Sequence, residues 1–171
     1  AKTYEAWQFN ALAGLAEGAA QEDSPFSKAL QKERKPIRDM VEAASALIGE
    51  PGAGEELRNA AIRLVGLSPA LGSIPAEALK RLADLLSIRN SLQLQELAID
   101  SLARFPSPEV PNLLLDSWKA QVPSIRSRIL TLILRREEWV GALLDAIESG
   151  LIASGEVGAL ERAGLTSHPN A

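Results

Sequence analysis

The stretch LRNAAIRLV at residues 57–65 decides the fold, because its spacing of apolar residues recurs twice later in the chain. Leu57, Ala61, Ile62 and Val65 stand at positions i, i+4, i+5 and i+8, which is one face of an α-helix. The same spacing occurs in LQELAIDSL at 94–102 and in IRSRILTLI at 125–133, displaced by 37 and then by 31 residues. The three stretches therefore predict three helices that bury equivalent positions.

Each of these helices follows another that opens at or just after a proline, namely Pro36, Pro75 or Pro111. A single helix pair cannot bury its own apolar face, whereas pairs stacked side by side form a continuous core between two helix layers. The variable period favours HEAT-like repeats over the stricter tetratricopeptide or ankyrin arrays, whose signature motifs are absent from the sequence. The alternative is a generic helical bundle, because any two amphipathic helices align tolerably well.

Together with the sequence on either side of them, these stretches predict eight or nine helices of about 10–16 residues and no strand. Leu and Ala are abundant and β-branched residues are few, which favours the same fold class. We expect an all-α, HEAT-like α-solenoid of about four helix pairs, as a single domain over residues 1–171 with a frayed tail at 165–171. The helices are expected at 3–20, 36–48, 55–67, 75–86, 91–104, 112–121, 124–136, 137–150 and, as a short last helix, 154–164, with a short segment at 25–32 between the first two.

Charge and composition exclude several classes of function. The net charge is −4, opposite in sign to that of a typical non-specific nucleic-acid binder. There is no cysteine, and the single histidine, His168, lies in the tail, so a histidine- or cysteine-based metal site or catalytic triad inside the fold is not expected. We predict no catalytic residue, no cofactor, no metal and no transmembrane segment in this chain.

The candidate interaction residues are arginines and tryptophans in the helices. Arg128 and Arg135 are seven residues apart and share a helix face, whereas Arg126 points about 160° away from Arg128. A solvated face is the ordinary role for such arginines, and a surface for an anionic partner is the sharper alternative. The tryptophans Trp7, Trp118 and Trp139 are expected to pack in apolar stripes. In the alternative reading, Trp118 and Trp139 join Arg126, Arg128 and Arg135 in a possible interaction surface.

Other conspicuous residues have simple structural explanations. The pairs Glu55/Glu56 and Glu137/Glu138 lie near expected helix starts, where negative charge stabilises the unpaired N–H groups. The glycines of GEPGAG at 49–54, with Gly66 and Gly72, match no phosphate-binding pattern and are expected to end helices in loops.

The run from Ser124 to Val157, followed by LTSHPN at 165–170, resembles the helical region of planctomycete-type membrane-bound dehydrogenase homologues, the haem-binding CxxCH proteins. Its most distinctive stretch contains Trp139, Leu143, Leu144 and Gly150, and residues 6–18 and 103–118 fit the same region. The resemblance implies an excised, exported or periplasmic domain that lies between a dehydrogenase-type β-propeller and a c-type cytochrome module. Haem c would belong to that following module of the parent and not to this chain, and no catalytic residue carries over.

These observations favour a non-catalytic scaffold or protein-interaction module, with flanking domains of the parent or a separate protein as its partner. The alternative is a HEAT-like nucleic-acid-binding or DNA glycosylase-type domain, although no nucleic-acid partner is expected from the charge. A helical bundle that dimerises through an exposed apolar stripe is a third reading.

Overall fold

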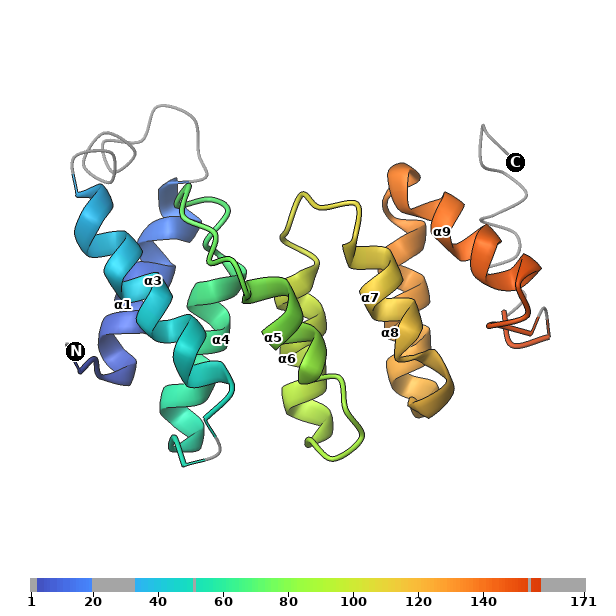
Figure 1. The fold of residues 1–171 in the computed structure, drawn as a ribbon, viewed down its shortest axis with the longest axis horizontal. Coiled ribbons are helices and arrows are strands. Elements are labelled where there is room, and N and C mark those ends of the chain that lie inside the picture. The colour runs from blue at the N-terminus through green and yellow to red at the C-terminus, as the bar shows by residue number, and fades with distance from the viewer. Residues whose placement is uncertain (1–2, 20–32, 51, 154, 158–171) are drawn as a thin grey trace.

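The computed structural model describes residues 3–19, 33–50, 52–153 and 155–157 of the chain. Within these ranges it holds eight α-helices, one short 3-10 helix (Trp118–Ala120) and no strand. The predicted all-α class is therefore confirmed (Figure 1). In chain order the α-helices are α1 (Ala6–Ala19), α3 (Arg34–Ile48), α4 (Glu55–Gly66), α5 (Ala78–Asp84), α6 (Leu92–Leu102), α7 (Val110–Asp116), α8 (Pro123–Leu134) and α9 (Glu137–Glu148).

Local signals explain where several helices begin. The first turns of α4 and α9 hold Glu55/Glu56 and Glu137/Glu138, so the predicted placement of these acidic pairs is confirmed. The Oγ of Ser91 accepts a hydrogen bond from the backbone N–H of Leu94 at 3.3 Å, which caps α6. Pro123 is the first residue of α8, where its missing N–H leaves no helical hydrogen bond unmade.

Two helices are shorter than predicted. Both α5 and α7 have seven residues, against the expected 10–16. A single turn, closed by the Ala78 N–H donating to the carbonyl of Pro75, precedes α5 and delays its start. At the end of α7, the Oγ of Ser117 donates to the carbonyl of Leu114 at 2.8 Å, and the chain tightens into the 3-10 helix. The predicted short segment at 25–32, the tail at 165–171 and most of the predicted last helix lie outside the described residues.

The described helices pack against helices that lie close to them in the chain, including α8 against α9. The pairs α3/α4, α5/α6 and α7/α8 are in contact, and so are helices two places apart: α4 with α6, α6 with α8, α3 with α5, α5 with α7 and α7 with α9. The first helix, α1, packs against α4. Figure 1 shows the helices following one another along the long axis of the molecule. We refer to α1, α4, α6 and α8 as the α1–α4–α6–α8 layer.

The apolar register predicted for α4, α6 and α8 is confirmed by burial. The three later positions of each stripe are almost fully buried, and of the first positions Ile125 is buried while Leu57 and Leu94 are half-buried. These equivalent positions therefore form the core between the helices. The fully buried members are Ala61, Ile62 and Val65 in α4, Ala98, Ile99 and Leu102 in α6, and Ile129, Leu130 and Ile133 in α8.

The tryptophans divide into two buried residues and one exposed residue. Trp118 and Trp139 are 1% and 2% exposed, so their predicted packing role is confirmed. Trp7 is 68% exposed, and its predicted packing is wrong. The buried face of α1 is formed instead by Phe9, Leu12, Ala13 and Ala16, and position 7 lies about 200° around the helix from Phe9.

Of the predictions for Gly72 and Gly66, one agrees with the structure and the other does not. Gly72 has a φ of +64° and lies in the turn after α4, in agreement with a role in ending that helix region. Gly66, by contrast, is the buried last residue of α4, where it faces Ser101 of α6. Gly66 therefore allows two helices to pack closely, and the prediction that it lies in a loop is wrong.

Candidate interaction surface

Three cavities open along the α1–α4–α6–α8 layer, each between successive helices. Cavity A, of about 260 Å³, lies where α1 and α4 end and reaches Arg104, just after α6. Cavity B, of about 450 Å³, lies between the first turns of α4 and α6 and is lined by Arg58 and Arg89. Cavity C, of about 330 Å³, lies between α6 and α8 and is lined by Arg128 and Arg135. These cavities form a series of grooves along the layer.

The structure places Arg128 and Arg135 on the lining of cavity C, so their predicted common face is confirmed. The guanidinium of Arg128 is held by the carboxylate of Asp100, with Nη2 2.7 and 2.6 Å from Oδ1 and Oδ2 and Nε 3.2 Å from Oδ1. These hydrogen bonds raise the pKa of Arg128, and its partial burial opposes the rise. Arg128 thus connects α8 to α6, and its charge is already paired.

Arg135 is different, because its guanidinium forms no ion pair and no hydrogen bond with any described residue. It is exposed at the C-terminal end of α8, where a positive charge is favourable beside the unpaired carbonyls of the helix. This helix-end effect accounts for a basic residue at the position and leaves the guanidinium available.

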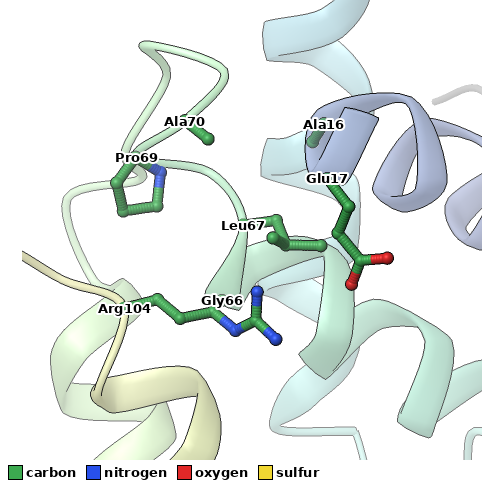
Figure 2. A pocket seen from close by; sticks show the side chains of 7 residues that line it. All are labelled: Ala16, Glu17, Gly66, Leu67, Pro69, Ala70 and Arg104. Carbon is green, nitrogen blue, oxygen red and sulfur yellow. The ribbon is translucent and has the colours of Figure 1, made fainter. Parts of the chain in front are cut away.

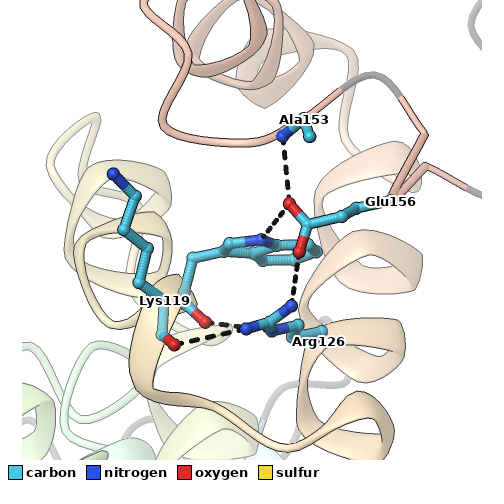
Figure 3. Close-up of polar contacts among 5 residues, drawn as sticks. Lys119, Arg126, Ala153 and Glu156 are labelled. Atoms are coloured by element: carbon cyan, nitrogen blue, oxygen red, sulfur yellow. Dashed lines mark hydrogen bonds and ion pairs between the residues drawn. The ribbon is translucent and has the colours of Figure 1, made fainter.

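The third predicted arginine, Arg126, lies apart from cavity C and holds the chain beyond α9 in place (Figure 3). Its Nε and Nη2 donate to the carbonyls of Trp118 and Lys119 at 3.1 and 3.2 Å, and its Nη1 lies 2.5 Å from Oε1 of Glu156. The guanidinium also lies 5.4 Å from the centre of the Trp118 ring. The role of Arg126 is therefore structural.

Glu156 completes this cluster. Its Oε2 accepts hydrogen bonds from the backbone N–H of Ala153 at 3.0 Å and from Nε1 of Trp118 at 3.4 Å. The N–H of Ala153 contributes most to lowering the pKa of Glu156, with Trp118 and Arg126 adding to the effect and desolvation opposing it. The ionised carboxylate ties the segment after α9 to the 3-10 helix.

Trp139 is covered in a similar way. The guanidinium of Arg136 lies 4.4 Å from the centre of its ring, and Nη2 of Arg136 donates to the carbonyl of Ala103. Because Trp118 and Trp139 are both buried, neither offers an open ring face to a partner. The residues of the predicted interaction surface that line a described groove are thus Arg128 and Arg135.

Sequence analysis missed Arg104 and Arg89, which line cavities A and B. Arg104 extends from the chain after α6 toward Leu67 and Glu17 (Figure 2). Within the described residues, neither guanidinium has a hydrogen-bond or ion-pair partner. One signal could have revealed Arg104, because it precedes Arg135 by 31 residues, the displacement between the second and third apolar stripes.

Together, the three cavities are lined by five arginines and three carboxylates, in a chain whose net charge is −4. Positive charge is thus concentrated in the grooves. The described residues contain no group of three or more metal-ligating His, Cys, Asp or Glu side chains. Among the same residues, no helix combines the length and the apolar character needed to cross a bilayer.

Comparison of the chain with known protein families, with curated proteins and with solved structures finds no match. The packing of the helices and the geometry of the grooves are therefore the basis on which a function can be proposed.

Proposed function

We propose that this chain is a non-catalytic scaffold and protein-interaction module, built as a HEAT-like α-solenoid of about four helix pairs. The observation that carries the proposal is the contact pattern. From α3 to α8, each helix packs on its pair partner and on a helix two places away in the chain, while α9 packs on α7 and α8. The helices α4, α6 and α8 therefore follow one another, as α3, α5, α7 and α9 do. Contacts limited to neighbouring units are typical of solenoids, and the grooves between units suit the binding of an extended partner.

The equivalent burial in α4, α6 and α8 supports the same proposal. A generic bundle gathers its helices around one central core, whereas repeated units bury the same position in each helix. Ile62, Ile99 and Leu130 occupy one such position and are all buried. The arrangement of charge adds a docking surface to this framework, in the arginines of cavities A, B and C.

We further infer a role for the module as a spacer between a dehydrogenase-type β-propeller and a c-type cytochrome module of an exported redox protein. The support for this step is the resemblance of residues 124–157 and 165–170 to the corresponding region of haem-binding CxxCH proteins. A C-x-x-C-H motif in the reading frame shortly beyond Ala171 would support the spacer role. A stop codon or an unrelated domain at that place would contradict the spacer role. The proposal of an interaction module would then be tested separately, by binding experiments on this chain.

Small-angle X-ray scattering tests the solenoid directly. A compact globule of 171 residues has a radius of gyration of about 16 Å. We expect a clearly larger value and a long tail in the pair-distance distribution. A measured radius of gyration of about 16 Å would overturn the solenoid.

A further inference from the structure

Arg104 and Arg135 occupy equivalent places in two successive units of the α1–α4–α6–α8 layer. Arg104 follows the buried Ile99 by five residues, and Arg135 follows the buried Leu130 by five residues. Each arginine lines the groove toward the preceding helix of the layer, with Arg104 facing the end of α4 and Arg135 facing α6. The two side chains therefore repeat one arrangement from one groove to the next.

Both guanidiniums are available to a ligand. Neighbouring arginines are paired, Arg63 with Glu17 at 2.8 Å and Arg128 with Asp100 at 2.6 Å. Arg104 and Arg135 have no such partner within the described part of the chain. A guanidinium presents a planar set of N–H donors that suits the two oxygens of a carboxylate, so each position fits one acidic side chain.

The spacing of the helices defines the spacing of the ligand groups. Packed helices have axes about 8–10 Å apart, so equivalent positions just after the contacting helices α6 and α8 are separated by about that distance. A peptide in the polyproline II conformation advances about 3.1 Å per residue and presents side chains three residues apart on the same face. Two acidic side chains about three residues apart would therefore reach both arginines.

We propose that Arg104 and Arg135 form a two-point docking site for an extended acidic segment of a partner protein, with carboxylates about three residues apart. The proposal rests on the proposed role as an interaction module and names the chemistry of its partner. A protein segment fits better than a nucleic acid for two reasons. The chain as a whole carries a net charge of −4, and cavities A, B and C have no aromatic side chain on which a base could stack.

The test is an NMR titration of the full chain with short peptides of defined spacing. The first probe is the capped peptide Ser-Gly-Glu-Ser-Ser-Glu-Gly-Ser, and the second is the isomer Ser-Gly-Glu-Glu-Ser-Ser-Gly-Ser, which has adjacent glutamates. We expect the first peptide to bind about threefold more tightly, with chemical-shift changes centred on Arg104 and Arg135. Arg104→Gln and Arg135→Gln should each weaken binding about threefold, and the double variant about tenfold.

Arg38→Gln is the matched control, because Arg38 is an exposed arginine on α3 with no described partner. It removes the same charge and should leave binding unchanged within about twofold. A short oligothymidylate is the second ligand, at about 50 mM salt. Tighter binding of the oligothymidylate than of either peptide would overturn the proposal in favour of a nucleic-acid partner.

The absence of binding by both peptides, or binding that is insensitive to the double variant, would also overturn the docking site. Scattering on the same sample separates this failure from failure of the proposed function. If the particle is long but binds neither peptide, the docking site is wrong and the scaffold proposal stands. If the particle is compact, the scaffold proposal is wrong, whether or not the peptides bind.

Discussion

Gly66 and Ser101 meet where α4 packs against α6, so closely that a Cβ atom on residue 66 would lie 2.7 Å from both Cβ and Oγ of Ser101. The neighbouring backbone is equally close, with Cα of Ser101 at 2.9 Å. The Oγ of Ser101 also donates to the carbonyl of Ile62 at 3.3 Å, which joins the two helices. Glycine is therefore required by the packing of α4 on α6.

Gly66→Ala should destabilise the protein by about 1–3 kcal/mol, because the added methyl group overpacks a contact that involves backbone atoms. Urea unfolding measures the change. Gly141→Ala in α9 is the control, since nothing lies within 4 Å of the added Cβ, and it should stabilise by about 0.5–1 kcal/mol. In a double-mutant cycle, Ser101→Gly should cost less stability in the Gly66→Ala background than alone, and equal costs would argue against a contact between these two residues.

The two arginines that connect elements through charge should differ in their importance. Arg126 is 27% exposed and donates to two backbone carbonyls, so Arg126→Gln should cost about 1–2 kcal/mol of unfolding free energy. The Arg128–Asp100 pair has side chains 42% and 53% exposed, so Arg128→Gln should cost less than about 1 kcal/mol. Equal losses for the two variants in urea unfolding would contradict the structural role assigned to Arg126.

Acid should release the segment that Glu156 holds. The folded-state pKa of Glu156 lies below its ordinary value of 4.5, so ionised Glu156 contributes stability above that pH. The contribution is lost as the pH falls through the lowered pKa. We expect the indole Nε1–H resonance of Trp118 to shift between about pH 5 and 2 in a titration followed by NMR.

Glu156→Gln should abolish that pH-dependent shift, because an amide cannot ionise. Glu148→Gln, which alters an exposed carboxylate on α9, should leave the shift unchanged. A shift that persists in the Glu156→Gln variant would show that another group titrates beside Trp118.

Trp7 and Trp118 should respond very differently to removal. Trp118 is almost fully buried, so Trp118→Ala should cost about 3–5 kcal/mol, with Trp118→Phe as a milder variant if the alanine variant does not fold. Trp7→Ala should change stability by less than about 0.5 kcal/mol, because its side chain is 68% exposed. Acrylamide quenching offers an independent measurement, since Trp7→Phe should remove most of the quenchable fluorescence.

The features that sequence analysis predicted well depend on local periodicity. The buried positions of α4, α6 and α8 follow from apolar spacing within each helix, and the acidic pairs follow from the chemistry of a helix start. The common face of Arg128 and Arg135 is equally local, because residues seven apart lie on one side of any α-helix.

The features that it missed depend on contacts between distant segments. The partners of Arg126 include Glu156, which is 30 residues away, and helical periodicity says nothing of such a contact. The role of Gly66 depends on where α4 and α6 approach each other. Whether the Arg104 guanidinium has an ion-pair partner depends on which carboxylates lie near it. Trp7 was misplaced because a large apolar residue favours burial without specifying which side of the helix faces the core.

The contact pattern also has a mechanical consequence. In the proposed solenoid, helices contact those close to them in the chain, so a force that separates α1 from α9 would be borne by successive interfaces in series. Each interface would yield by a small amount, so the whole molecule could lengthen or bend without rupture at any one place. The solenoid would then behave as an elastic element along its length.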